Sequence, residues 1–447
     1  MERIGRSCKR KRDDAAAKTM VVAASFASST HGYEIVTITQ WLDGWSSSGV
    51  DNNNSNILPL VDLRSYEEFN KTQIHYTDDT TPLIVNLPLA TLISGERSCE
   101  LPPRHVEFAI LVPNNYTELF SSLNNSQCSI HNLFFATMSS ATQQSRKPWL
   151  VRQVILESED LWNEEGVLNY IKRNTDVNCK SNSSTISFRP LPRLWKPDPL
   201  VSSGILSLLK HWISKQCDTS RIESNQHTPC TVFDLGSGAG RDVCYLAEET
   251  KEYYHNSMLQ QQAKEQNTSQ QNHFPLQFVG IDNHKGSAKR CEPLWRNRGV
   301  DDVTTSHLLN LNKLDSVNDC FTNKTFIDQQ TTKNETSTST VVCIYAIRFL
   351  NRKLFSHIAS STSRNEPPSI CLPIGTIMAI SHFCKPTKTA EWNFDHPKVS
   401  NVLDRDELSS MFGNNNDGEK WCILRDDISD DGDHGRTLIN FIARKIA

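Results

Sequence analysis

The chain has 447 residues, of which 37% are hydrophobic, 22% charged and 8% aromatic, and this composition excludes a fibrous or wholly disordered protein. The sequence has 47 Lys and Arg and 51 Asp and Glu, so its net charge is -4. This charge gives no reason to expect a protein that binds nucleic acids or membrane surfaces. No stretch approaches the roughly 18 consecutive apolar residues of a membrane-spanning helix.

Thirteen cysteines are spread along the chain without a Cys-x-x-Cys pair. The sequence therefore indicates reduced thiols, and it predicts neither a zinc ribbon nor any other metal site. Residues 1–36 are predicted to be a disordered leader, whose basic tetrad Lys9–Arg12 fits either a solvated charged tail or a nuclear signal. No secretory signal is present, so we expect a cytoplasmic protein, with the nucleus as the alternative.

A first α/β unit is predicted over residues 37–172. Residues 58–69 have the pattern of a strand that turns into a helix, residues 83–89 and 108–112 that of further strands, and an acidic segment follows at 158–166. Together with the Leu-Pro-Pro turn at 101–103, this order of parts resembles a rhodanese-like domain.

In active rhodaneses a nucleophilic cysteine follows the central strand, in a loop of backbone N–H groups. Here Val112 is followed by Pro113-Asn-Asn-Tyr116, which contains no thiol, and Pro113 also removes an N–H donor. Cys99 precedes the strand and Cys128 lies well beyond it. We expect a degenerate module that binds a partner, with sulfur transfer by a displaced Cys128 as the alternative. Arg64 is expected to be a helix-start or salt-bridge residue.

A linker is predicted over residues 173–199, ending in the Pro-rich run 190–199, and a second unit over residues 200–447. Three polar segments cannot bury enough apolar surface to offset the entropy of ordering them. They are predicted to be loop insertions: Asp51–Asn56, Leu259–Asn272 and Thr331–Thr340.

The second unit begins with a strand pattern at 231–235, a glycine-rich turn and a helix pattern at 241–249. A ligand that approaches the backbone closely requires residues without Cβ, and the helix start offers free N–H groups. The spacing is D-x-G-x-G-x-G, starting at Asp234. It differs from the G-x-G-x-x-G of dinucleotide-binding proteins, and the lysine of a phosphate-binding Walker loop is absent.

Residues 233–242 resemble motif I of the class I S-adenosylmethionine-dependent methyltransferases. The resemblance implies that Asp282, at the end of the strand pattern 278–283, accepts hydrogen bonds from both ribose hydroxyls. It also implies that Asn310, or alternatively Asn312, contacts the adenine amino group. The alternative is a plain α/β turn whose glycines serve packing only. The residues expected at the cofactor are Asp234, Gly236, Ser237, Gly238, Gly240, Asp282, Asn283 and Asn310.

Further strands are predicted at 303–313, 341–350 and 375–383, and a closing antiparallel hairpin at 421–427 and 436–444. The expected fold is therefore α/β: a rhodanese-like domain followed by a doubly wound, Rossmann-like domain with a C-terminal antiparallel hairpin. More residues separate Asp234 from Asp282 than a first strand–helix–strand unit usually contains, and the Gln-rich insertion is expected to account for the extra residues.

Three segments, at 193–199, 348–352 and 393–408, resemble the tellurite-resistance and thiopurine-methyltransferase-like branch, which implies a small, polarizable acceptor. The Asn-Pro-Pro-Tyr type of motif of amino-methylating enzymes is missing, which disfavours amine targets and nucleic acid. The predicted function is methyl transfer from S-adenosylmethionine to an unidentified small molecule. An adaptor that keeps both folds for binding alone is the alternative.

The sequence identifies no committed general base. His382 is the best positional candidate, although a lone histidine at a strand end is more often structural. Tyr345 and Arg348 are candidates for orienting the acceptor, because they lie at the carboxyl end of a predicted strand. Asp242, at the start of the first helix of this unit's sheet, is expected to be a cap or a partner of the helix dipole.

Overall fold

A computed structural model describes the chain in segments and divides it into two compact units, residues 1–186 with 192–196 and residues 187–191 with 197–447. No helix in the described part of the chain is both long and apolar enough to cross a membrane. The described residues, less Thr39 and His105, are 33–41, 58–71, 84–113, 129–134, 148–157, 193–219, 230–265, 274–313, 340–360, 372–387, 391–413, 421–429 and 436–446.

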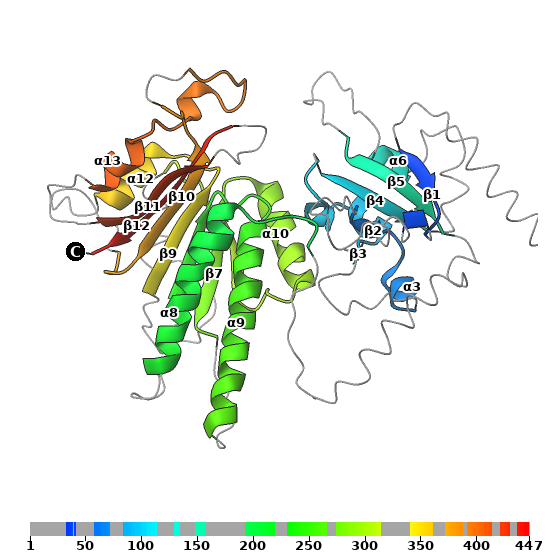
Figure 1. Ribbon diagram of the computed structural model, residues 1–447, viewed down its shortest axis with the longest axis horizontal. Coiled ribbons are helices and arrows are strands. Elements are labelled where there is room, and N and C mark those ends of the chain that lie inside the picture. The colour runs from blue at the N-terminus through cyan, green and yellow to red at the C-terminus, as the bar shows by residue number, and fades with distance from the viewer. Residues whose placement is uncertain are drawn as a thin grey trace, which may run out of the picture. The chain divides into compact units, whose positions relative to one another are not determined.

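The first unit contains a five-stranded, all-parallel sheet (Figure 1). The strand and helix patterns at 58–69, 83–89 and 108–112 are confirmed, whereas residues 51–56 and 158–166 lie outside the described residues. In sheet order the strands are β1 (Glu34–Val36), β5 (Leu150–Leu156), β4 (Glu107–Val112), β2 (Leu60–Asp62) and β3 (Ile84–Asn86). The helical elements are α3 (Tyr66–Lys71), α4 (Leu89–Ile93), η1 (Ser98–Glu100) and α6 (Ser129–Phe134).

The central strand β4 is buried on both faces, as expected for a parallel sheet covered on both sides. Phe108, Ile110 and Val112 belong to one apolar cluster, and Ala109 and Leu111 belong to another. The alternation of side chains along a strand assigns these two sets to opposite faces.

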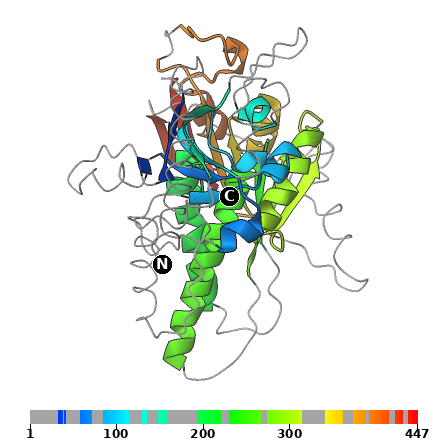
Figure 2. The ribbon, with the colours of Figure 1, turned by 90° about the vertical axis from the view of Figure 1, so that its right-hand side faces the viewer.

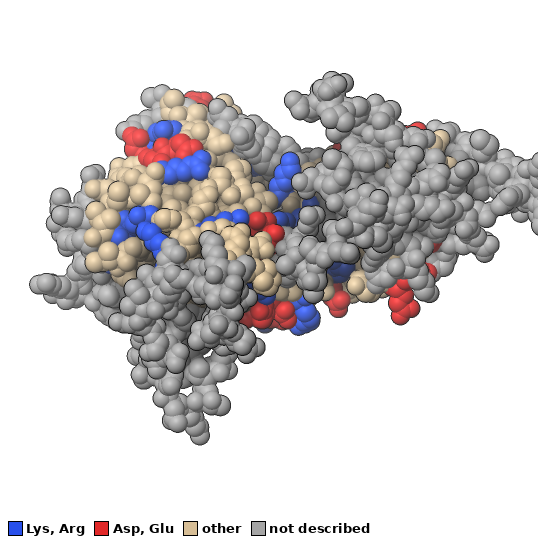
Figure 3. All heavy atoms as spheres, turned by 60° about the horizontal axis from the view of Figure 1, so that its bottom comes forward, with Lys and Arg blue, Asp and Glu red and all other residues tan. Residues whose placement is uncertain are grey.

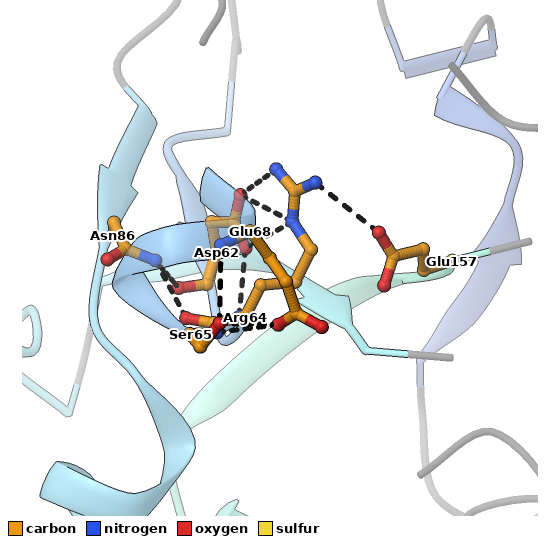
Figure 4. Close-up of polar contacts among 6 residues, drawn as sticks. All are labelled: Asp62, Arg64, Ser65, Glu68, Asn86 and Glu157. Carbon is orange, nitrogen blue, oxygen red and sulfur yellow. Dashed lines mark hydrogen bonds and ion pairs between the residues drawn. The ribbon is translucent and has the colours of Figure 1, made fainter. Parts of the chain in front are cut away.

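A buried network of charges joins the carboxyl ends of β2 and β5 in the first unit (Figure 4). Arg64 Nη2 lies 2.6 Å from Asp62 Oδ2, and Arg64 Nη1 lies 3.3 Å from Glu157 Oε1. Asn86 Nδ2 donates to the carbonyl oxygens of Asp62 and Arg64. Burial raises the pKa of Asp62, and the bonds from Arg64 oppose that rise. The prediction that Arg64 is a salt-bridge residue is confirmed.

The helix that follows this network begins with a capping box. Ser65 Oγ accepts from the Glu68 N–H at 3.2 Å, and Glu68 Oε2 accepts from the Ser65 N–H at 3.0 Å. These reciprocal bonds satisfy two backbone donors that a helix start leaves without partners.

The second unit contains a seven-stranded mixed sheet. The last strand runs antiparallel between two neighbours, so the predicted closing hairpin is confirmed. In sheet order the strands are β11 (Trp421–Ser429), β12 (Leu438–Lys445), β10 (Ile377–Phe383), β9 (Thr340–Ile347), β6 (Cys230–Leu235), β7 (Leu276–Asp282) and β8 (Thr304–Leu308).

Helices cover both faces of this sheet, which makes the second unit a doubly wound α/β fold. Figures 1 and 2 show α8 and α9 over one face and α12 and α13 over the other. Side chains of α12 and α13 pack with the central strands into one apolar core. The helical elements are η4 (Leu200–Ile205, a π-helical turn), α8 (Leu206–Thr219), α9 (Arg241–Glu265), α10 (Lys285–Asn297), α12 (Arg352–Ala359), η5 (Val399–Asn401) and α13 (Glu407–Gly413).

The prediction of a loop at Leu259–Asn272 is wrong for residues 259–265, which continue α9 beyond the edge of the sheet (Figure 1). Residues 259–265 are Leu, Gln, Ala, Lys and Glu, which are all good helix formers, and an existing helix adds residues without a new nucleation cost. Low hydrophobicity argues against burial but not against an exposed helix. Residues 266–272 lie outside the described residues, as do 331–339 of the third polar segment.

Replacing Arg64 by alanine is expected to lower the free energy of unfolding of the first unit by about 3 to 5 kcal/mol, because Asp62 then remains buried without its cation. Urea denaturation followed by circular dichroism measures this change. Arg152→Ala is the matched control, since Arg152 pairs with Glu107 with side chains 51% and 43% exposed, and we expect no measurable change there. Equal effects of the two substitutions would contradict a stabilising role for the buried network.

Candidate functional site

The order of strands in the second unit reverses direction between β6 and β9. From β6 the chain proceeds through β7 to β8 on one side, and through β9 to β10 on the other. In doubly wound sheets ligands bind beyond the carboxyl ends of the strands at this switch point. Asp234 of β6 lies in register with Tyr345 of β9, so both candidates sit at this point.

The glycine-rich turn follows β6, and its three glycines differ in function. All have positive φ, at 79° for Gly236, 55° for Gly238 and 71° for Gly240. A Cβ at Gly236 would lie 2.7 Å from the Phe349 ring, and one at Gly240 would lie 2.8 Å from Cys291 Sγ. A Cβ at Gly238 would meet no described atom within 4 Å. Gly236 and Gly240 therefore serve packing, and Gly238 faces open space.

The turn is held in place by β7 and α10. The N–H groups of Gly236 and Ser237 donate to the Ile281 carbonyl at 2.8 and 3.0 Å. On the other side, Trp295 Nε1 of α10 donates to the Gly240 carbonyl at 3.0 Å. The turn is thus rigidly placed without any contribution from a ligand.

Asp282, at the end of β7, points its carboxylate at the same turn. Its Oδ2 accepts from the Gly238 N–H at 2.9 Å, and its Oδ1 accepts from the His284 N–H at 2.7 Å. A carboxylate has about four acceptor positions, so each oxygen retains one for a further donor. Asn283, the next predicted residue, is exposed.

The two asparagines proposed for adenine follow β8, whose end lies beside Asp282. The Leu309 N–H donates to the Asp282 carbonyl at 2.9 Å. Asn310 is exposed, and its Oδ1 accepts from the Asn312 N–H at 3.0 Å. Asn312 Oδ1 accepts from Asn351 Nδ2 at 3.1 Å. Both side-chain carbonyls therefore already accept one hydrogen bond, and Asn310 lies in a local turn of its own.

Asp198, just before η4, has partners on β10 and α9 and in the segment after β9, and the sequence prediction missed it. Its Oδ2 accepts from Ser381 Oγ of β10 at 3.2 Å and pairs with Arg348 Nη2 at 3.3 Å. Its own N–H donates to Asp242 Oδ1 at 3.3 Å. Asp198 lies far from all of these partners in sequence, so no spacing rule could have identified it.

The carboxyls at the switch point lie close enough to perturb one another. Burial, and then the Asp198 carboxylate, raise the pKa of Asp242 to about 6. Burial and the Asp242 carboxylate also raise the pKa of Asp234 well above its ordinary value, while Tyr345 opposes that rise. Asp242 Oδ1 accepts from the Asp198 N–H, and no described hydrogen bond joins it to the first N–H groups of α9, so the expected cap is not what this bond forms. Its position in the first helical turn does favour a negative charge.

Arg348 follows β9 in an unusual backbone conformation. It has a φ of 57°, and its N–H donates to the Ser381 carbonyl at 2.8 Å. Positive φ is uncommon for residues other than glycine and tends to mark functional positions. The conformation places Arg348 against Asp198, at the edge where the acceptor is expected.

His382 lies apart from this group. Successive side chains of a strand alternate between faces, so His382 lies on the face opposite Ser381 and Phe383. Its Nε2 lies 2.8 Å from the Asn401 carbonyl oxygen. Burial lowers the pKa of His382 to about 4. The bond orients the imidazole ring and leaves Nδ1 without a described partner, so the catalytic role of His382 stays a prediction.

In the first unit, β4 ends at Val112 and is followed by Pro113, where the structure's description stops until residue 129. Asn114–Tyr116 and Cys128 lie outside the described residues. Cys99 is buried in η1, before β4. Within the described segments, no group of three or more His, Cys, Asp or Glu is placed to hold a metal ion.

The sequence matches no protein-family model and no curated protein. Solved structures similar to the chain include the [4+2]-cyclase SpnF, with 11% identity, a TM-score of 0.29 and coverage of 53% of this chain and 81% of SpnF. TehB from Haemophilus influenzae has 15% identity and a TM-score of 0.27, over 52% of this chain and 62% of TehB. A SAM-dependent methyltransferase from Aquifex aeolicus has 16% identity and a TM-score of 0.27, over 53% of this chain and 98% of its own. Likeness at this level assigns neither reaction nor substrate.

The three glycines are expected to respond differently to alanine. Gly236→Ala forces a Cβ against the Phe349 ring and should lower the melting temperature of the second unit by several degrees. Gly238→Ala costs only the strain of a left-handed residue, about 1 to 2 kcal/mol, because its Cβ enters open space. Differential scanning calorimetry compares the two. A larger loss in Gly238→Ala would show that Gly238 also serves packing.

Proposed function

We propose that the second unit is an S-adenosylmethionine-dependent methyltransferase. One observation at the switch point supports the proposal most directly. Among the three glycines of the turn, only Gly238 has no described atom where a Cβ would lie, and its N–H donates to the Asp282 carboxylate at the end of β7. This arrangement offers a backbone surface for a ligand and, beside it, a fixed acceptor pair for a vicinal diol.

The residues present fit the nucleoside part of this cofactor. Asp282 would accept from the ribose hydroxyls, Gly236–Gly240 would line the backbone contact, and Asn310 or Asn312 would lie toward the base. When bound, the cofactor supplies an activated methyl group on a sulfonium. The chain would therefore need chiefly to position the acceptor in line and to exclude water.

The acceptor would lie beyond β9 and β10. Arg348 follows β9, whereas Tyr345 lies within β9 and is fully buried, and its pKa is raised well above its ordinary value by burial and by Asp234. Tyr345 is therefore better suited to support Asp234 than to deprotonate an acceptor. With His382 bonded elsewhere, the described residues favour an acceptor that is already anionic or loses its proton to solvent.

A small-molecule acceptor is favoured over nucleic acid. On the face shown in Figure 3, basic and acidic side chains of the described residues lie beside one another and form no broad basic surface. Phosphate-backbone binding relies on clustered Lys and Arg. The net charge of -4 points in the same direction.

An adaptor that uses both folds for binding alone is the competing proposal, because bound cofactor does not prove turnover. For the first unit we propose a rhodanese-like binding module without sulfur transfer. The parallel α/β sheet and the absence of cysteine between Val112 and Cys128 support this proposal.

Titration calorimetry with S-adenosylmethionine, S-adenosylhomocysteine and NAD tests the cofactor proposal. We expect both sulfur nucleosides to bind and NAD not to bind. Asp282→Ala should weaken binding by at least tenfold, since hydrogen bonds to a charged group contribute roughly 1.5 to 3 kcal/mol. Asp301→Ala, an exposed aspartate before β8, is the matched control and should bind as the unaltered chain does.

Binding of NAD without binding of either sulfur nucleoside would overturn the cofactor assignment. Normal affinity in Asp282→Ala would show that the ligand lies elsewhere in the unit. If the cofactor binds but labelled methyl reaches no member of a broad acceptor screen, the adaptor proposal gains support.

The purified chain is expected to show no thiosulfate-to-cyanide sulfur transfer above that of Cys128→Ser. The reaction needs a thiolate in the loop after the central strand, and Pro113–Tyr116 contain no sulfur. A colorimetric thiocyanate assay measures it. Activity that disappears in Cys128→Ser would place the nucleophile at Cys128 and make the first unit catalytic.

A further inference from the structure

The segment that follows β9 crosses the carboxyl edge of the second sheet and ends at Asn351, the residue before α12. Along this segment, Arg348 pairs with Asp198, and the Phe349 ring packs against the glycine-rich turn. Asn351 then contacts the loop after β8, residues 309–313, which we call the base loop. The segment therefore reaches both the turn and the loop between which the nucleoside is proposed to lie.

The side chain of Asn351 forms hydrogen bonds in two directions. Its Oδ1 accepts from the Leu354 N–H at 3.0 Å, which caps the first turn of α12. Its Nδ2 donates to the Leu311 carbonyl at 2.9 Å and to Asn312 Oδ1 at 3.1 Å. Ser and Asp cap helices about as well as Asn does, because a cap requires only an acceptor. The amide donor of Asn351 thus does something that the cap alone does not require.

The base loop is attached to the cofactor end of the sheet as well as to α12. The Leu309 N–H donates to the Asp282 carbonyl at 2.9 Å, so the loop starts beside the carboxylate proposed for the ribose. Leu311 is 4% exposed and belongs to the apolar core of the unit, whereas Asn310 and Asn312 are exposed. A base attached to a ribose at Asp282 would therefore meet polar groups of a loop that is held at its centre by Asn351.

The hydrogen bonds fix which way the amides point. A backbone N–H can only donate, so the Leu354 N–H determines that Oδ1 of Asn351 faces α12 and that Nδ2 faces the base loop. Because Nδ2 can only donate, it determines in turn that Asn312 directs its Oδ1 toward Asn351. The orientation of an amide at the base loop is thus set by the start of a helix.

An oriented amide distinguishes bases that a rotating amide does not. Asn312 Oδ1 has two acceptor positions and uses one for Asn351, so the other remains for the amino group of a base. Its Nδ2 can donate to a ring nitrogen, which is the pattern by which asparagine pairs with adenine. A 6-carbonyl base would place an acceptor against Oδ1. An amide that could turn over would offer its NH₂ group to that carbonyl instead.

We propose that Asn351 is a positioning residue of the base subsite, which orients the Asn312 amide and thereby selects a 6-amino purine over a 6-oxo purine. This inference rests on the proposed methyltransferase function. Asn351 acts through Asn312 and need not touch the ligand itself. If Asn351 served only as a helix cap, its replacement by another capping residue would leave the choice of base unchanged.

The test uses the full chain and titration calorimetry with two ligands that differ only in the base. S-adenosylhomocysteine carries the 6-amino group, and S-inosylhomocysteine carries a carbonyl in its place. We expect the unaltered chain to bind the adenosyl compound at least tenfold more tightly. In Asn351→Ser this preference should fall to threefold or less, because the hydroxyl can still cap α12 but is too short to hold the base loop.

Further variants separate positioning from stability. Asn351→Asp also keeps the cap and replaces the donor by an acceptor, so it should lose the preference too. Asn312→Ala should lose it because the oriented amide is gone. Asn297→Ser, the same substitution at an exposed position of α10, is the matched control and should keep it. Melting temperatures of the two capping variants should lie within a few degrees of the unaltered chain.

The outcomes distinguish this inference from the function on which it rests. If S-adenosylhomocysteine does not bind the unaltered chain, the proposed function fails. If it binds and the inosyl compound binds equally well, the base subsite is wrong and the cofactor proposal stands. A preference that persists in both Asn351→Ser and Asn351→Asp would show that Asn351 is a helix cap alone.

Discussion

The hydrogen bond from the Gly238 N–H to the Asp282 carboxylate, at 2.9 Å, is the contact on which the second unit's site depends. It joins the turn after β6, one of the two strands at the switch point, to the end of the neighbouring strand β7. Because the carboxylate is oriented by a backbone donor on each oxygen, it is ready to accept from a ligand without rearranging. This one hydrogen bond therefore fixes both Gly238, which offers the backbone surface for a ligand, and the Asp282 carboxylate, which would recognise it.

Much of this arrangement could be predicted from local sequence. The Asp-x-Gly-x-Gly-x-Gly spacing identified the turn, and the β-rich runs identified every strand of the second sheet. Both are signals that a short window contains, since strand patterns and positive-φ turns depend on neighbouring residues. The distinct functions of the three glycines could not be predicted, because Phe349 and Cys291, which decide them, are distant in sequence.

The missed features share one physical cause. Asp198 meets Ser381 and Arg348, and Arg436 meets Phe383 and the His396 carbonyl, only when segments far apart in the chain come together. The wrong prediction over residues 259–265 has a different origin, because a polar composition does not exclude a helix. An exposed helix requires good helix formers rather than an apolar face, and those residues supply them.

The two units depend on buried charge in different ways. In the first unit, Arg64 is enclosed by Asp62 and Glu157, so the charges are largely satisfied within the protein. In the second, Asp198, Asp234 and Asp242 gather at the carboxyl edge, and the pKa of Asp242 rises to about 6 although the charges of Arg241 and Arg348 oppose that rise. Perturbed carboxyls at a switch point are more typical of functional sites than of structural networks.

Hydrogen–deuterium exchange with and without S-adenosylhomocysteine locates the bound ligand on the chain. We expect slower exchange in peptides covering residues 236–244 and 280–284, with residues 60–112 of the first unit unaffected. NAD should produce no such protection. Protection confined to other segments, or none at saturating ligand, would contradict a cofactor site built on Gly238 and Asp282.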